Sequence, residues 1–236
     1  MGQQDLKDIF LEQGFFVLRD QIDPSIIHSI NARSRDLIPN RGHGIDNKYW
    51  PQDTVKDCPE LALWWSQQLT DWPQIRTIGD LLIKTVGFLF DDPCVYVADV
   101  ISNTPKNKYI KPHIDSPYRF EQWHKNFDLL GVQCIIPLCA FSKDNGATGL
   151  LPQSHKKNWV VKDSYKGMYN EEFLKNVVQP TMDIGDLLVY HPRVLHSTMP
   201  NHTDTVRRAL LVHITSNAMA EQMKLVDNVF TGLPSL

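Results

Sequence analysis

His113 and Asp115 form a His-x-Asp pair within residues 111–117, KPHIDSP. In an extended strand successive side chains alternate between faces, so these two side chains would point to the same side. An imidazole nitrogen and a carboxylate oxygen would then converge on one point. Two histidines and one carboxylate around a metal with open coordination positions are typical of non-haem Fe(II) oxygenases. A surface histidine beside a loop aspartate gives the same pattern, so a third ligand decides the interpretation.

His196 is the candidate for that third ligand. It follows a Gly-Asp turn and a predicted strand at residues 187–190, and it lies 81 residues beyond Asp115 (196 − 115). Two ligands close in sequence and one distant are expected when a metal lies between non-adjacent strands. His191 is the nearest rival, but it precedes a proline and suits the end of the strand better.

Arg207 begins the last predicted strand, residues 207–216, and stands eleven residues after His196 (207 − 196). A guanidinium offers a planar fork of donors that matches a carboxylate. Arg207 therefore suits a dicarboxylate co-substrate whose other end chelates the metal. Arg208 is expected on the opposite face of the strand. A buried structural ion pair is the alternative role for Arg207.

Helices are predicted in the first part of the chain and strands in the second. Apolar spacing and cap residues predict helices at about 5–13, 24–38, 59–69 and 72–90, a short strand at 14–18, and a long loop at 39–57. From residue 92 onward, β-branched and aromatic residues dominate. We therefore predict a mainly β fold with flanking α-helices that pack on one side of an antiparallel sheet.

The chain length fits one domain, residues 1–236. We divide it into a helical N-terminal part (about 1–91), a β core (about 92–216) and a C-terminal tail (217–236).

Composition and charge exclude several classes of protein. A net charge of -3 and a pI near 6.3 give no field for binding nucleic acid or an anionic membrane. The chain has no run of about 18 apolar residues and no signal-peptide pattern at its N-terminus. The cysteines lack C-x-x-C spacing and fit reduced residues of a cytoplasmic protein: Cys58, Cys94, Cys134 and Cys139. We expect a small-molecule substrate and no nucleic-acid or membrane partner; no feature indicates an oligomeric state.

Five separated motifs, taken together, resemble the phytanoyl-CoA dioxygenase family of Fe(II)/2-oxoglutarate-dependent oxygenases. In order they are His113-Ile-Asp115, Asn145-Gly146 leading to Leu151-Pro-Gln-Ser-His155, Gly185-Asp186, His196-Ser-Thr198, and Asn201 followed by Arg207. The resemblance covers about residues 95–215. It implies a double-stranded β-helix (jelly-roll) core that binds Fe(II) and 2-oxoglutarate and consumes O2.

The resemblance also implies roles for single residues. It assigns His113, Asp115 and His196 as iron ligands. It assigns Arg207 to the distal carboxylate of 2-oxoglutarate, and Thr198 retains the hydroxyl that commonly bonds the same carboxylate. The retained carboxylate of Asp115 favours hydroxylation, because related halogenases lose this ligand.

Other residues around the centre are less firmly placed by the family pattern. Some members contact the co-substrate from the strand after the His-x-Asp pair, and Gln133 is the candidate for that contact here. The segment just past the pair offers candidate substrate contacts, with packing at the rim as their alternative role: Tyr118, Arg119 and Trp123. The family's usual P-G-S-H is P-Q-S-H in this chain, which leaves the geometry of the turn at Gln153 open.

The function implied is hydroxylation of a C–H bond of a small molecule, with release of succinate and CO2. Two other classes stay open. One is a cupin-like metalloenzyme that does not use 2-oxoglutarate. The other is a non-catalytic jelly-roll module that keeps a metal for structure, although a structural zinc site normally has four Cys or His ligands.

Overall fold

The computed structural model describes residues 2–37, 72–103, 105, 112–115, 117–118, 122–123, 125–157 and 168–231. The predicted loop at 39–57, the predicted helix at 59–69, Cys58 and Arg119 lie outside the described residues.

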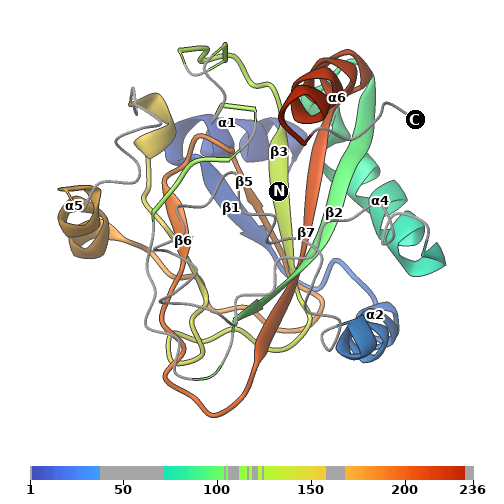
Figure 1. Ribbon diagram of the computed structural model, residues 1–236, viewed down its shortest axis with the longest axis vertical. Coiled ribbons are helices and arrows are strands. Elements are labelled where there is room, and N and C mark those ends of the chain that lie inside the picture. Colours follow the sequence, from blue (N-terminus) through green and yellow to red (C-terminus); the bar gives the residue numbers. More distant parts are fainter. Residues whose placement is uncertain are drawn as a thin grey trace.

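Two antiparallel sheets form the centre of the molecule (Figure 1). The larger sheet has the strand order β1-β5-β3-β7-β2, and the smaller sheet pairs β4 with β6. The elements in chain order are α1 (Gln3–Gln13), β1 (Phe15–Leu18), α2 (Pro24–Leu37), α4 (Pro73–Val86), η2 (Gly87–Leu89), β2 (Pro93–Asn103), β3 (Val132–Pro137), β4 (Thr148–Leu150), η3 (Ser154–Lys156), α5 (Met168–Asn176), β5 (Leu187–Tyr190), β6 (His196–Thr198), β7 (Arg207–Ser216) and α6 (Asn217–Thr231).

The first helix and strand form as their residues predict. Leu6 and Phe10 lie one turn apart on α1 and are both buried. The helix ends at Gly14, which has a φ of 88° and donates its N–H to the carbonyl of Phe10. Glycine adopts this left-handed conformation without strain. The chain then turns directly into β1, which joins the edge of the large sheet beside β5.

Alternation along the strands gives the large sheet two different faces. On β3, Cys134 and Ile136 pack against the helices in one core cluster, whereas Ile135 packs into a second cluster on the opposite face. Figure 1 shows α2 and α4 on one side of this sheet and β6 on the other. The helices therefore cover the outer face, and the inner face looks toward the smaller sheet. This is the predicted layering.

The C-terminal segment differs from the predicted tail, because residues 217–231 form helix α6. The hydroxyl of Ser216 accepts a hydrogen bond from the backbone N–H of Met219, as a helix cap does. Met219, Ala220 and Met223 are buried at helical spacing. The helix lies against β2 and β7. Among the described residues, no helix is long and apolar enough to cross a membrane.

Candidate metal centre

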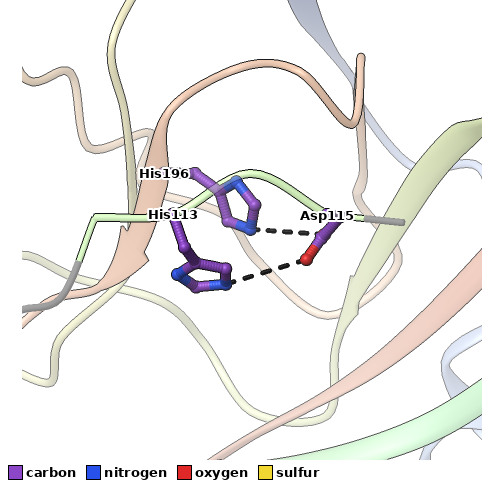
Figure 2. Close-up of side chains that lie close together, drawn as sticks. All are labelled: His113, Asp115 and His196. Carbon is purple, nitrogen blue, oxygen red and sulfur yellow. Dashed lines mark ion pairs between the residues drawn. The ribbon is translucent and has the colours of Figure 1, made fainter. Parts of the chain in front are cut away.

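Three side chains that are distant in sequence converge at one point: His113, Asp115 and His196 (Figure 2). Their candidate ligand atoms all lie within 4.8 Å of one another. His113 Nε2 is 3.7 Å from Asp115 Oδ1, and His196 Nε2 is 3.3 Å from Asp115 Oδ2. The two imidazole rings lie 4.3 Å apart between centroids. The structure thus brings together the three residues that the sequence analysis named as ligands.

The backbone explains why the three meet. His113 and His196 exchange two hydrogen bonds, from N–H to carbonyl, of 2.9 and 3.0 Å. The N–H of Asp115 donates to the carbonyl of Pro192 at 2.8 Å. Residues 113–115 are therefore not the continuous strand that was predicted, because His113 forms only an isolated bridge. Pairing with the segment before β6 holds the ligands together instead.

A hydrogen bond fixes which nitrogen of His196 faces the centre. His196 Nδ1 lies 2.8 Å from the carbonyl of Val194, so it carries the proton and donates it. The Nε2 lone pair then points toward the carboxylate of Asp115 at 3.3 Å. In the metal-free protein a proton on this lone pair can bridge the two atoms, because the carboxylate raises the pKa of His196. A divalent metal bound to one oxygen and two imidazole nitrogens would take the place of that proton.

The charges of this cluster support the same conclusion. Burial by itself would raise the pKa of Asp115, but the nearby rings of His196 and His113 and the hydroxyl of Tyr190 outweigh it and lower that pKa. Burial would lower the pKa of His196, yet the carboxylate of Asp115 raises it overall. Asp115 is therefore an anion that attracts positive charge into the centre.

Tyr190 is a member of the centre that the sequence analysis missed. Its hydroxyl is 2.9 Å from Asp115 Oδ2 and 3.3 Å from His196 Nε2. Burial and the adjacent carboxylate raise the pKa of Tyr190 well above its usual value, so the hydroxyl keeps its proton. Once a metal occupies the His196 lone pair, this proton is donated to Asp115. Alternation along the strand puts Tyr190 on the same face as Leu188, but only the structure shows that this face points inward.

The Tyr190→Phe protein is expected to bind Fe(II) or Co(II) about tenfold more weakly, since residues that orient metal ligands typically contribute 10–100-fold to affinity. Calorimetric titration with Co(II), which is stable in air, measures this change. Tyr118→Phe is the matched control, because it removes a buried hydroxyl that bonds only to the backbone at Asp128 and Leu130. Equal Co(II) affinity in the Tyr190→Phe and wild-type proteins would contradict the role of this hydroxyl.

Arg207 is a buried cation on the inner face of the large sheet. It is 2% exposed, and Nη2 donates to the carbonyl of Gly146 at 2.7 Å. Its Nε has no hydrogen-bond partner, and no carboxylate lies within ion-pair distance among the residues that the structure describes. Burial lowers the pKa of Arg207 to about 10, so it stays charged at neutral pH. A buried guanidinium with a free donor and no counter-ion is suited to an anionic ligand.

Thr198 and Gln133 occupy different surroundings. Thr198 is half-buried on β6, two residues after His196 and so on the same face of that strand. Gln133 is buried on β3, opposite Tyr190 on one side and His213 on the other. Both therefore lie on strands that border the interior.

His191, the rival for the third ligand, lies outside the cluster of three ligands. Its ring is buried between Phe10, Tyr118 and His155, with centroids 5.3–5.9 Å away. Its Nδ1 accepts a hydrogen bond from the backbone N–H of Arg193 at 3.0 Å. It closes the end of β5, as its position before a proline predicted.

The unfolding free energy is expected to fall by about 2 kcal/mol between pH 6.5 and about pH 5, at about 1.4 kcal/mol per pH unit. Burial lowers the pKa of His191 from 6.5 to about 3. Between these two values the imidazole of the unfolded chain is protonated, whereas that of the folded protein stays neutral. The stability is complete above the unfolded pKa and is lost as the pH falls. Urea unfolding at several pH values measures the slope. His191→Asn keeps a hydrogen-bond acceptor for the N–H of Arg193 and should reduce the dependence of the unfolding free energy on pH. An unchanged pH dependence would mean that other groups cause it.

Two of the predicted substrate contacts, Tyr118 and Trp123, differ in how deeply they are buried. Tyr118 is completely buried, its hydroxyl donates to the carbonyl of Asp128, and it accepts from the N–H of Leu130. Its hydroxyl is therefore occupied by hydrogen bonds to the backbone. Trp123 is half-buried in the same segment.

The turn at Gln153 has the geometry that a glycine would give. Gln153 has a φ of 62°, in the left-handed region, and its N–H donates to the carbonyl of Gln13. Its side chain donates to Glu12 at 2.8 Å. These bonds to the end of α1 compensate for the strain of a non-glycine residue there.

The sequence model for the family described as phytanoyl-CoA dioxygenase matches residues 91–209, half of the chain. An iron/alpha-ketoglutarate-dependent dioxygenase of Aspergillus calidoustus, ausO, is 33% identical over 95 residues, which is 39% of this chain. The dioxygenase lolE1 of Epichloe uncinata is 27% identical over 173 residues, or 71% of this chain. These matches cover 30% and 65% of the two relatives, so the chain spans less than two thirds of either protein.

Among solved structures, EctD from S. alaskensis, with 2-oxoglutarate and 5-hydroxyectoine bound, has a TM-score of 0.70 at 15% identity. The alignment covers 92% of this chain and 77% of EctD. At this identity the likeness establishes the fold, which is the double-stranded β-helix predicted from the sequence.

Proposed function

Since the chain belongs to the phytanoyl-CoA dioxygenase family, we propose that it is an Fe(II)- and 2-oxoglutarate-dependent dioxygenase that hydroxylates a C–H bond of a small molecule. One observation carries the proposal: His113, Asp115 and His196 place three ligand atoms within 4.8 Å of one another. Two neutral imidazoles and one carboxylate leave coordination positions open for co-substrate and O2.

The chain's own residues prepare this centre. The Nδ1–H of His196 donates to Val194 and leaves Nε2 to ligate. The hydroxyl of Tyr190 holds Asp115 Oδ2, which leaves Oδ1 on the side of His113. Fe(II) bound here together with 2-oxoglutarate would supply the oxidising chemistry, with consumption of O2 and release of succinate and CO2.

Arg207 is proposed to hold the distal carboxylate of 2-oxoglutarate. The carboxylate would supply the counter-charge that this buried guanidinium lacks among the described residues, and it would accept from the free Nε. Thr198 would add a hydroxyl donor from β6. This binding places the co-substrate inside the sheets, away from bulk water.

For the substrate, we propose a small molecule that enters past the segment following Asp115, with Trp123 and Arg119 as contacts. The relatives support this class: EctD has 5-hydroxyectoine bound. We further propose a cytoplasmic location and no nucleic-acid or membrane partner. Free thiols at the described cysteines are consistent with a reducing compartment: Cys94, Cys134 and Cys139.

An anaerobic titration tests the function without knowledge of the substrate. Adding 2-oxoglutarate to the Fe(II)-loaded protein is expected to give a weak visible charge-transfer band. A cupin-like enzyme that does not use 2-oxoglutarate would bind iron without this band, and the proposal would then fail. If the band forms, stimulated succinate release in a metabolite screen would identify the substrate.

A further inference from the structure

Gln133 is a buried polar side chain whose oxygen has no partner in the part of the chain that the structure describes. The residue is 4% exposed, and its Oε1 makes no hydrogen bond with any described residue. Buried side-chain oxygens in native proteins are almost always bonded, because leaving one unpaired is unfavourable. An exception in the interior of a protein needs a physical reason, and a bound ligand supplies one.

The register of the sheet places Gln133 beside the metal centre. It lies directly opposite Tyr190 on β5 and opposite His213 on β7. Residues opposite one another share a face, and Tyr190 reaches Asp115 from the inner face. Gln133 therefore projects into the interior, one strand away from a residue that touches the ligand cluster.

Gln133 and Arg207 stand at opposite ends of this face. Arg207 is the first residue of β7, whereas His213, the partner of Gln133, lies six residues later. At about 3.3 Å per residue the two positions are roughly 20 Å apart along the strand. A co-substrate held between Arg207 and the metal lies toward the start of β7. Gln133 borders the side of the metal centre that faces away from Arg207. This position differs from the role of co-substrate contact that the sequence analysis gave to Gln133.

The side chain of His213 forms the wall next to Gln133. Tyr96 packs edge-on against this ring, with centroids 5.6 Å apart. A Cβ on Gly131 would lie 2.3 Å from His213 Nε2, so the absence of a side chain at position 131 lets the ring lie there. The ring of His213 is thus held in place between Tyr96 and the backbone at Gly131.

The charges of this face and the hydrogen-bonding groups of Gln133 restrict the class of ligand. Asp99 lies on the inner face, opposite Leu211, and Asp115 lies at the ligand cluster. Arg207, the guanidinium of the same face, is at the far end of β7. A carboxylate or phosphate at Gln133 has no proton to donate to the unpaired Oε1, whereas an alcohol hydroxyl can donate to Oε1 and accept from Nε2.

We propose that Gln133 forms a substrate subsite that takes a neutral hydroxyl group, on the side of the metal centre away from Arg207. The inference rests on the proposed function and adds to it the chemical class of the substrate: an alcohol, not an acid. Gln133 fixes the orientation of the substrate through this hydroxyl.

Gln133→Met tests the subsite, because it keeps the length of the side chain and removes both polar groups. The Fe(II) protein with 2-oxoglutarate bound is titrated anaerobically with cyclohexanol and, separately, with cyclohexanecarboxylate, and the change in the charge-transfer band is followed. In the wild-type protein cyclohexanol is expected to give a saturable change and cyclohexanecarboxylate none. In the variant, cyclohexanol is expected to bind about tenfold more weakly, as for loss of one hydrogen bond to a ligand.

Two further measurements separate a substrate contact from other roles. The affinity for 2-oxoglutarate is expected to stay within about twofold of wild type, since the subsite lies apart from the co-substrate. The midpoint of urea unfolding of the metal-free variant is expected to shift upward, because an unpaired buried amide is replaced by an apolar group. Gln179→Met is the matched control: the same change is made at a half-buried side chain that bonds Ala147, and the titrations should not change.

The outcomes are distinguishable. A loss of 2-oxoglutarate affinity of about tenfold or more in Gln133→Met would make this residue a co-substrate ligand and overturn the inference. Equal binding of cyclohexanol to both proteins, no binding to the wild type, or saturable binding of the carboxylate would also overturn it. Failure of the wild-type protein to form the band with 2-oxoglutarate would instead remove the proposed function itself, before any variant is made.

Discussion

The Asp115→Ala protein is expected to bind Fe(II) more than about 100-fold more weakly than the wild type, beyond the 10–100-fold typical of residues that only support a ligand. The variant removes the single anion among the three converging side chains and leaves two neutral imidazoles. Without the carboxylate, nothing in the cluster offsets the positive charge of the ion. Turnover of 2-oxoglutarate should be lost together with the metal.

Calorimetry with Fe(II) under anaerobic conditions, or with Co(II) in air, measures this loss. Asp144→Ala is a suitable control, because Asp144 is an exposed aspartate whose backbone carbonyl, not its side chain, bonds His202. Circular dichroism should give the same folded spectrum for both variants. Undiminished metal affinity in Asp115→Ala would mean that the triad is not the metal site.

The Arg207→Met protein is expected to bind iron normally and to lose at least about 100-fold in affinity for 2-oxoglutarate, or about 3 kcal/mol, a loss typical of breaking a buried charged pair. Methionine keeps an apolar stem and removes the guanidinium, whose central carbon lies 4.6 Å from the centre of the Phe141 ring. Because the cation is buried without a carboxylate in the described structure, the metal-free protein should not be destabilised by the change.

The anaerobic charge-transfer band reports on this variant directly, since it requires iron and 2-oxoglutarate together. Arg208→Met is the matched control: it deletes the adjacent guanidinium, which lies on the opposite face of β7. A normal charge-transfer band in Arg207→Met, or loss of the band in Arg208→Met, would mean that Arg207 is not the residue that binds the distal carboxylate of 2-oxoglutarate.

The convergence of His113, Asp115 and His196 could be predicted from the sequence because metal chemistry restricts residue types so strongly. His113 and Asp115 were joined by a two-residue spacing, and His196 by its place after a strand. The reason given for the first pair was only partly right, since residues 113–115 are held by hydrogen bonds to residues 192 and 196 and not by a long strand. Long-range pairing of this kind leaves no local pattern.

Tyr190 and Gln133 show what sequence patterns omit. Alternation along a strand predicts which residues share a face, but the register between strands decides which of them meet. Gln133 lies opposite Tyr190 only because β3 and β5 pair in this register. Helix α6 was missed for a different reason: its cap at Ser216 and its buried Met219 and Met223 were present, but they followed a long strand and were treated as a tail.

The paired backbones of His113 and His196 have a consequence for the order of folding and metal binding. Each backbone donates to and accepts from the other, so the two positions that carry the imidazoles are held together without help from the metal. In many small metal-binding domains the ion drives folding and its removal unfolds the chain. We therefore expect the chain to fold first and to bind its ion afterwards. Chelation should therefore leave a folded receptor, to which iron, cobalt or nickel can be added back in turn.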